Sequence, residues 1–250
     1  MISFNPEQRF IVTGASSGIG EGVALLLNEL GASVIGIGRN VERLDGMKAK
    51  AKKPENMFLE KKDLVEDVQG LPVYVKELKE KYGKFSGMAY CAGVSALMPA
   101  KAYDFPYAQE IFLNNYFAPL FMTKGLIDKR NTVGRGTSIV IISSIDAILA
   151  TRGQSLYSGA KGALCSTMRA ISKEVTPYGH RVNCILPSMI KTPMAGIVAT
   201  GQCGFTEVDE RYPFGWGEPI DVASMVAFLL SDRARFISGQ NYVLDSGGML

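Results

Sequence analysis

Short apolar runs alternate along the chain with longer segments in which apolar residues recur at helical spacing. The runs predict strands at residues 10–13, 33–37, 57–59, 87–90, 138–143, 182–186 and 242–244. The longer segments predict helices at residues 18–30, 41–51, 65–81, 107–128, 156–175 and 219–230. Continuously apolar strands that alternate with helices are typical of a parallel sheet covered on both faces. The pattern therefore predicts an α/β fold, a doubly wound, mostly parallel sheet of about seven strands, Rossmann-like, with helices on both faces.

Composition and charge limit the partners of this chain. With 47% hydrophobic and 20% charged residues, it has the make-up of an ordinary globular protein. A net charge of +3 does not indicate the basic surface that nucleic acid requires, so we expect no nucleic-acid partner. The first residues lack the regions of a signal peptide, and the most apolar stretch, 138–150, is too short to span a bilayer. We therefore expect a cytoplasmic protein without membrane association.

Cysteine and histidine usage argues against a metal site. No two cysteines have the CxxC spacing of zinc or redox motifs, which favours reduced thiols at Cys91, Cys165, Cys184 and Cys203. His180 is the single histidine, so a multi-histidine zinc site is impossible. It follows Gly179 at a predicted helix-to-strand turn, and we interpret it as a surface turn residue.

A glycine-rich turn, TGASSGIG at residues 13–20, lies between the first predicted strand and the first predicted helix. Gly14 permits a tight exit from the strand, Gly18 lets the backbone approach a pyrophosphate, and Gly20 lets the helix pack closely on the sheet. The helix N-terminus then presents N–H groups and its positive dipole end to phosphates. We therefore assign dinucleotide binding to Gly14, Ser16, Ser17, Gly18, Ile19 and Gly20.

The residue after the second predicted strand distinguishes the two nicotinamide dinucleotides. A carboxylate at this point binds the adenosine ribose, whereas a basic residue pairs with a 2′-phosphate. The chain carries Arg39 there, whose guanidinium matches a phosphate, and this predicts NADP(H). A solvated arginine at a strand end is the alternative. Asp63, after the third strand, is a candidate acceptor for the adenine amino group or a plain turn residue.

Tyr157 and Lys161 are four residues apart and share one face of a predicted helix. A phenol with a pKa near ~10 is a poor acid–base catalyst at neutral pH, and we expect the nearby ammonium to lower that pKa. Ser144 lies at the carboxyl end of a predicted strand, where ligands bind in open α/β sheets, and its hydroxyl can hold the reacting oxygen. The three residues together indicate proton transfer to or from a carbonyl or alcohol oxygen.

In this order and spacing, the TGxxxGIG run, Ser144 and the YxxxK pair resemble the single-domain branch of the short-chain dehydrogenase/reductase family, across essentially the whole chain. The resemblance implies that Asn115, with Asn114 as the competing assignment, holds a water that connects Lys161 to solvent. It also implies that Lys161 bridges the nicotinamide ribose hydroxyls. Tyr157 belongs to the same cofactor site, together with Ala92 and Gly93 beside the adenosine ribose and Pro187, Ile190 and Thr192 near the nicotinamide.

The chain departs from the family pattern at two places. The family's NNAG motif is replaced by Tyr90-Cys91-Ala92-Gly93. The asparagines that brace the central sheet in the family are therefore absent, which puts that bracing in doubt. The family's proline-glycine pair after the sixth strand is replaced by Pro187-Ser188. The closing segment, 239–248, resembles the strand through which family members form dimers or tetramers, so we expect a homotetramer or homodimer.

We predict one dinucleotide-binding and catalytic domain over residues 1–250, with a substrate lid at residues 192–217, where glycines and prolines interrupt any periodicity. Apolar and aromatic side chains in or near this segment favour an apolar or acyl substrate: Met189, Met194, Phe205, Phe214 and Trp216. The same side chains are also suited to a core. Basic residues that suit either an acidic carrier protein or a solvated surface are Lys129, Arg130, Arg135 and Arg169.

The function that this sequence predicts is hydride transfer between NADP(H) and a carbonyl or secondary alcohol, with Tyr157 as the general acid or base. A 3-oxoacyl thioester reductase is the first substrate hypothesis, and sugar, steroid and small-ketone reductases stay open. The alternative is a catalytically silent NADPH-binding sensor or scaffold, which the full set of catalytic residues argues against. Epimerases and dehydratases of this kind usually carry a larger second domain, for which 250 residues leave little room. A serine hydrolase would need a plausible histidine partner, and His180 is the single histidine.

Overall fold

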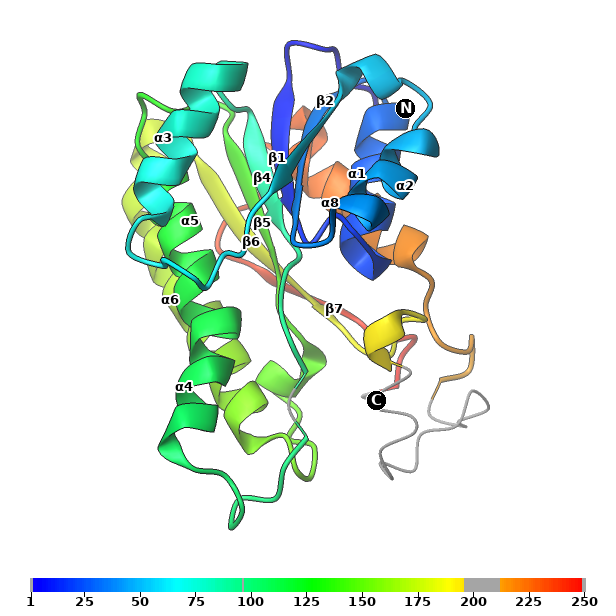
Figure 1. Ribbon diagram of the computed structural model, residues 1–250, viewed down its shortest axis with the longest axis vertical. Helices are drawn as coiled ribbons and strands as arrows, with labels where there is room; N and C mark the ends of the chain where they lie inside the picture. Colours follow the sequence, from blue (N-terminus) through cyan, green and yellow to red (C-terminus); the bar gives the residue numbers. More distant parts are fainter. Residues whose placement is uncertain (1, 96, 196–211, 249–250) are drawn as a thin grey trace.

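The computed structural model describes residues 2–95, 97–195 and 212–248, and these contain one seven-stranded sheet (Figure 1). All strand pairs are parallel, as the apolar runs predict. The strand order is β3 (Met57–Lys61), β2 (Ser33–Gly38), β1 (Arg9–Thr13), β4 (Gly87–Tyr90), β5 (Ser138–Ile142), β6 (Arg181–Pro187) and β7 (Asn241–Leu244). This order confirms the Rossmann-like, doubly wound fold.

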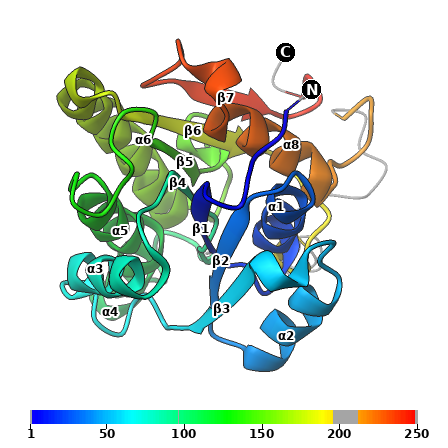
Figure 2. The ribbon, with the colours of Figure 1, turned by 90° about the horizontal axis from the view of Figure 1, so that it is seen from above.

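Helices cover both faces of the sheet, as Figure 2 shows from above. One face carries α1 (Gly18–Glu29), α2 (Val41–Ala49) and α8 (Pro219–Leu230), and the other carries α3 (Leu71–Tyr82), α4 (Phe105–Phe112), α5 (Ala118–Leu126) and α6 (Ser155–Val175). A separate apolar core fills each interface, so the central strands are buried on both sides. Burial on both faces explains why these strands are continuously apolar instead of alternating.

The carboxyl ends of the strands meet at one edge of the sheet, between the two layers of helices. β1 lies between β2 and β4, so the chain leaves β1 toward one face and β4 toward the other. Ligands of open α/β sheets bind at such a switch point. The turn after β1 and residues 91–94 after β4 both lie there.

Two helices differ from the predicted ones for local reasons. The helix expected at 65–81 begins at Leu71, because Pro72 suits a first helical turn and turns occupy the residues before it. The helix expected at 107–128 is interrupted by a π-helical turn, η2 (Leu113–Phe117), between α4 and α5. Such turns are frequent at functional sites, and a count of apolar spacing does not reveal them.

The interpretation of His180 as a surface residue is wrong. Its side chain is 2% exposed, because Gly179 adopts a left-handed conformation that turns His180 inward at the start of β6. Burial lowers the pKa of the imidazole, and neither ring nitrogen has a hydrogen-bond partner among the described residues.

Part of the predicted lid, residues 196–211 with Phe205, lies outside the described residues, as does Cys203. The flanking residues 192–195 and 212–217 are described. No helix in the described part of the chain is long and apolar enough to cross a membrane. The assignment of residues 1–250 to one domain stays a prediction.

Candidate active site

Two adjoining cavities open at the carboxyl ends of the strands. The first, of ≈ 220 Å³, is lined by the turn after β1 and by the ends of β2 and β4. The second, of ≈ 480 Å³, is lined by the end of β5, the start of α6 and the segment after β6. The two share Ile19, Cys91, Gly93, Val94, Thr192 and Met194. A ligand that fills the first cavity therefore extends directly into the second.

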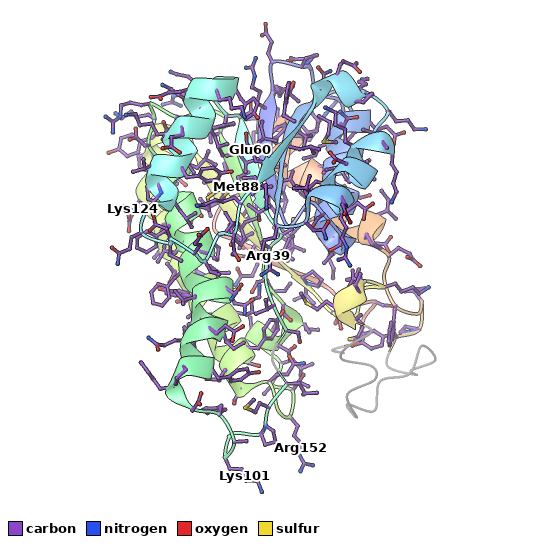
Figure 3. All side chains as sticks on the ribbon, viewed as in Figure 1. Arg39, Glu60, Met88, Lys101, Lys124 and Arg152 are labelled. Carbon is purple, nitrogen blue, oxygen red and sulfur yellow. The ribbon has the colours of Figure 1, made fainter. Side chains whose placement is uncertain are left out.

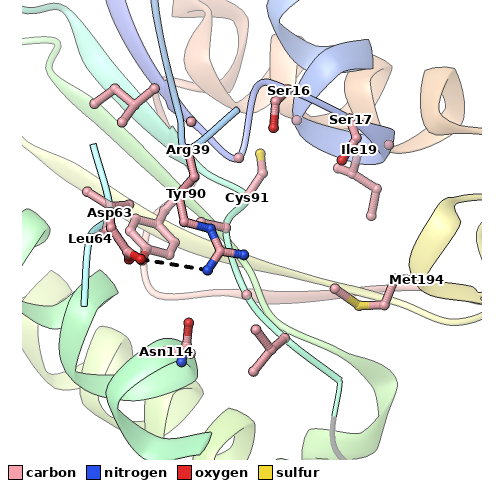
Figure 4. A pocket seen from close by; sticks show the side chains of 18 of the residues that line it. Ser16, Ser17, Ile19, Arg39, Asp63, Leu64, Tyr90, Cys91, Asn114 and Met194 are labelled. Atoms are coloured by element: carbon pink, nitrogen blue, oxygen red, sulfur yellow. Dashed lines mark ion pairs between the residues drawn. The ribbon is translucent and has the colours of Figure 1, made fainter. Parts of the chain in front are cut away.

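The glycine turn forms a cradle in the wall of the first cavity (Figure 4). Gly14 and Gly18 adopt left-handed conformations, with φ of 67° and 58°. A Cβ at Gly14 would lie 3.0 Å from the Ala92 nitrogen, and one at Gly18 would lie 3.0 Å from the Thr192 side chain. The predicted dinucleotide residues that line this cavity are Gly14, Ser16, Ser17, Gly18, Ile19, Gly20, Arg39, Asp63, Ala92, Gly93 and Thr192.

Arg39 and Asp63 lie together at the mouth of the first cavity, where Figure 4 draws their ion pair. Arg39 Nη1 is 3.7 Å from Asp63 Oδ2, and the Arg39 side chain is 68% exposed. Figure 3 shows Arg39 near the middle of the molecule, far from Arg152 and Lys101 at its lower end. A guanidinium that is this exposed remains accessible to a phosphate.

Thr13 braces the central sheet at the place where the asparagines of the family's NNAG motif are absent. Its side-chain oxygen accepts hydrogen bonds from the Cys91 nitrogen at 3.0 Å and from the Ala92 nitrogen at 3.1 Å. Thr13 is fully buried at the end of β1. One hydroxyl therefore ties the ends of β1 and β4 together beside the glycine cradle.

Thr13→Val is expected to lower the free energy of unfolding by about 1–3 kcal/mol, because it leaves two partly buried N–H groups without an acceptor. Thr13→Ser keeps the hydroxyl and should lose much less. Urea unfolding of both variants would measure the difference, and equal losses would argue against this role for the hydroxyl.

Ser144, Tyr157 and Lys161 converge on the second cavity. Tyr157 and Lys161 lie one turn apart on α6, and Ser144 caps a 3₁₀ turn, η3 (Ile145–Ala147), directly after β5. Tyr157 forms a hydrogen bond with Ser144, and the Lys161 ammonium lies 5.7 Å from the centre of the Tyr157 ring. The structure thus brings together residues that are up to 17 positions apart (161 minus 144).

Asn115 lines the same cavity from the π-helical turn, whereas Asn114 lines the first cavity. The Asn115 amide donates to the carbonyl oxygens of Val94 and Ile111, at 3.1 and 3.0 Å. A Cβ built on Gly93 would lie 2.9 Å from Asn115 Oδ1 and 3.6 Å from Lys161 Nζ. The geometry therefore favours Asn115 over Asn114 as the neighbour of the lysine.

The pKa values differ from the expected pattern. Burial raises the pKa of Tyr157 to about 12, although the hydrogen bond from Ser144 acts in the opposite direction. Burial also lowers the pKa of Lys161 to about 8, and its ammonium donates to the Ile142 carbonyl oxygen at 3.0 Å. The expectation that Lys161 depresses the pKa of Tyr157 is not met here, because desolvation of the phenol dominates. Tyr157 is consequently protonated at neutral pH.

The last residue of β6, Pro187, completes the second cavity together with Ile190 and Thr192 from the segment that follows. The serine that replaces the family glycine has a defined role in this structure. The Ser188 and Tyr212 hydroxyls form a hydrogen bond of 2.6 Å, which connects the residue directly after β6 to a residue within the predicted lid. Of the expected apolar lid residues, Trp216 is buried and Phe214 is 89% exposed.

Sequence reasoning missed several residues of the second cavity, and four polar ones lie between Ser144 and Tyr157. Asp146, Thr151, Arg152 and Gln154 all line it. Their place in the chain between Ser144 and Tyr157, which both line this cavity, was the signal that could have found them.

The fold, the glycine cradle and the cluster around Tyr157 together define a Rossmann-type oxidoreductase. A family model described as enoyl-(acyl carrier protein) reductase matches residues 14–249. The chain belongs to the short-chain dehydrogenase/reductase family, as the sequence motifs indicate. It is an oxidoreductase that acts on a carbonyl or alcohol group with a nicotinamide cofactor.

Individual relatives extend over almost the full chain. The 3-oxoacyl-(acyl-carrier-protein) reductase FabG of Rickettsia conorii is 33% identical over 246 residues, 96% of this chain and 95% of the relative. The NAD-dependent glycerol dehydrogenase of Listeria innocua is 30% identical over 242 residues, 95% of this chain and 92% of the relative. A solved short-chain type dehydrogenase/reductase from Mycobacterium ulcerans, 32% identical, has a TM-score of 0.88 and covers 99% of this chain and 91% of that chain.

Proposed function

We propose that this protein is an NADP(H)-dependent carbonyl reductase in which Tyr157 protonates the reacting oxygen. The observation that carries the proposal is the pair of adjoining cavities, one with the exposed Arg39 at its mouth and the other with Ser144 and Tyr157 in its wall. The adenosine end of the dinucleotide fits the first cavity and the nicotinamide end fits the second. This arrangement argues against a silent sensor, which has no need of a proton donor in the second cavity.

The residues present fit the cofactor. Gly14 and Gly18 carry no side chain, so a pyrophosphate could approach the backbone of the cradle, and α1 begins at Gly18 with its N-terminal N–H groups beside the cradle. Pro187, Ile190 and Thr192 would hold the nicotinamide end, and Asp63 would meet the adenine. When bound, the cofactor supplies the hydride.

Ser144 and Tyr157 would both donate hydrogen bonds to the carbonyl oxygen, which stabilises the negative charge that develops there. Tyr157 would then donate its proton to that oxygen, because its raised pKa keeps the phenol protonated at neutral pH. Lys161 would reach the ribose hydroxyls, and a water held at Asn115 would return the proton from solvent through Lys161 to Tyr157. The proximity of Asn115 and Lys161 at Gly93 supports this relay.

Arg39→Ala is expected to remove a preference for NADPH over NADH of at least about tenfold, or ~1.4 kcal/mol, because no other basic residue follows β2 directly. Fluorescence titration of wild type and variant with both nucleotides would measure it. Arg235→Ala makes the same charge change at an exposed residue outside both cavities and serves as the control. A wild type that prefers NADH would contradict the assignment of the 2′-phosphate to Arg39.

Two further predictions concern assembly and location. A homodimer or homotetramer through β7 and its neighbours would be measured by light scattering of the purified protein, and a cytoplasmic location by fractionation of cells. Reduction of a 3-oxoacyl thioester is a substrate hypothesis that the name of the Rickettsia conorii relative supports, and assay of such a thioester with NADPH would test it.

A further inference from the structure

A third cavity, of ≈ 390 Å³, lies directly beyond one wall of the second cavity. The residues that line both cavities are Ser188, Met189, Ile190 and Tyr212. The rest of the described lining of the third cavity comes from residues 214–217, the start of α8, the end of β7 and the two residues after β7. Whether a substrate in the second cavity extends into the third therefore depends on the wall that the four shared residues form.

The backbone of this wall is held in place by hydrogen bonds to its neighbours. The Ser188 nitrogen donates to the Leu244 carbonyl oxygen of β7 at 2.9 Å. The Gly217 nitrogen donates to the Met189 carbonyl oxygen at 2.9 Å, and the Lys191 nitrogen donates to the Gly217 carbonyl oxygen at 2.8 Å. An opening between the two cavities therefore has to come from the side chains of the wall and not from its main chain.

A pair of hydroxyl groups closes the wall where two side chains meet. Ser188 Oγ and Tyr212 Oη are 2.6 Å apart, although the two residues are separated by 24 positions in the chain. Each of the two residues lines both cavities, so their contact lies between the cavities. Loss of either hydroxyl breaks the contact, and loss of the Tyr212 ring removes one of the two side chains from the wall.

The third cavity would suit an apolar group if the wall were open. Two of its polar side chains already accept hydrogen bonds from the backbone, Asp221 from the Glu218 nitrogen at 2.7 Å and Ser246 from the Phe214 nitrogen at 3.1 Å. Its apolar lining includes Trp216, Val222, Val243 and Leu244. An alkyl chain would bury apolar surface against these side chains, and the closed wall withholds that gain from the substrate.

We propose that the hydrogen-bonded hydroxyls of Ser188 and Tyr212 set the upper size of the substrate, because they separate the second cavity from the apolar third cavity. The chemical class is therefore a compact ketone or aldehyde and not a carbonyl compound with a long alkyl chain. The inference rests on the proposed function, in which the nicotinamide end of the cofactor takes part of the ≈ 480 Å³ of the second cavity and leaves the remainder to the substrate.

Methyl ketones from 2-butanone to 2-decanone differ only in chain length and test this size limit with NADPH. For wild type we expect kcat/KM to stop increasing with chain length once the second cavity is filled. In Tyr212→Ala each further methylene can enter the third cavity, which should raise kcat/KM by roughly three- to fourfold. The ratio of kcat/KM for 2-decanone to that for 2-butanone should therefore exceed the wild-type ratio by at least about tenfold.

Two further variants show whether the hydroxyl pair itself closes the wall. Ser188→Ala removes one hydroxyl but keeps the Tyr212 ring, so it should raise the same ratio by less than Tyr212→Ala does. Tyr178→Ala, at a tyrosine that is 61% exposed and lines neither cavity, should leave the ratio unchanged. Because the ratio is measured within one protein, it needs no comparison of folding between variants, and Ser188→Ala serves if Tyr212→Ala does not fold.

Trp216 reports the occupancy of the third cavity directly, because it lines that cavity and is the single tryptophan of the chain. The bromine atom of 10-bromo-2-decanone quenches indole fluorescence on contact, whereas 2-decanone carries no such quencher. With the protein saturated with NADP⁺, we expect the bromo ketone to quench Trp216 in Tyr212→Ala more strongly than in wild type. This measurement does not depend on turnover.

Each outcome decides for or against the inference. A ratio in Tyr212→Ala equal to that of wild type, or equal quenching of Trp216 in the two proteins, would overturn it. A wild type whose kcat/KM increases with every methylene up to 2-decanone would also overturn it, while carbonyl reduction stands. If wild type reduces none of the ketones, the proposed function fails and the inference fails with it.

Discussion

Tyr157→Phe is expected to lower kcat for carbonyl reduction by about 10²–10⁴-fold and to leave NADPH affinity nearly unchanged. The substitution removes the proton donor but keeps the ring, which packs beside Lys161. Stopped-flow or steady-state oxidation of NADPH would measure turnover, and fluorescence titration would measure binding. Tyr178→Phe removes an exposed phenol and should change neither quantity. Turnover near wild type in Tyr157→Phe would refute the assignment of Tyr157 as the acid.

The pH dependence follows from the same side chain. Since burial raises the pKa of Tyr157 to about 12, the phenol is protonated throughout the neutral range and reduction needs no change in its state. Oxidation of an alcohol needs the phenolate, whose population increases as pH rises toward that pKa. We therefore expect the oxidation rate to rise with pH while Tyr157 keeps reduction constant.

The fold was predictable because its signals are local and repeated. Strands buried on both faces must be apolar at every position, and the turn after β1 needs glycines where the backbone adopts a positive φ. Both requirements leave a mark on the sequence itself. That Ser144, Tyr157 and Lys161 line one cavity was predictable for the same reason, since a strand end faces the first turns of a helix.

Other properties depend on contacts between distant segments and left no such mark. The burial of His180 depends on how the turn at Gly179 packs against residues 135–136, and the pKa of Tyr157 depends on how much water the cavity wall excludes. The thiols of Cys165 and Cys184 lie within hydrogen-bonding distance although 19 positions separate them (184 minus 165). Sequence spacing describes neighbours along one element, and these three features arise between elements.

Lys161 connects activity and stability, because the structure places an ammonium where solvent is excluded. The side chain is 4% exposed, and burial lowers its pKa to about 8 from 10.5. The unfolded chain therefore binds this proton more tightly than the folded protein does, and folding carries the full cost below pH 8. The cost falls as pH rises from about 8 to 10.5, so this group makes the free energy of unfolding increase with pH over that interval.

Lys161→Met is expected to lower turnover by about 10²-fold or more and to raise the free energy of unfolding at pH 7 by roughly 1–3 kcal/mol. The methionine fills a similar volume without a charge, and the gain is reduced because the Ile142 carbonyl loses its donor. Urea unfolding of the cofactor-free protein at several pH values would measure it, and the excess stability of the variant should shrink between pH 8 and 10.5. Lys124→Met, at an exposed position on α5, should show neither effect. A variant that is less stable than wild type at pH 7 would show that the ammonium is well solvated in the folded protein, and the buried proton relay would then lose its physical basis.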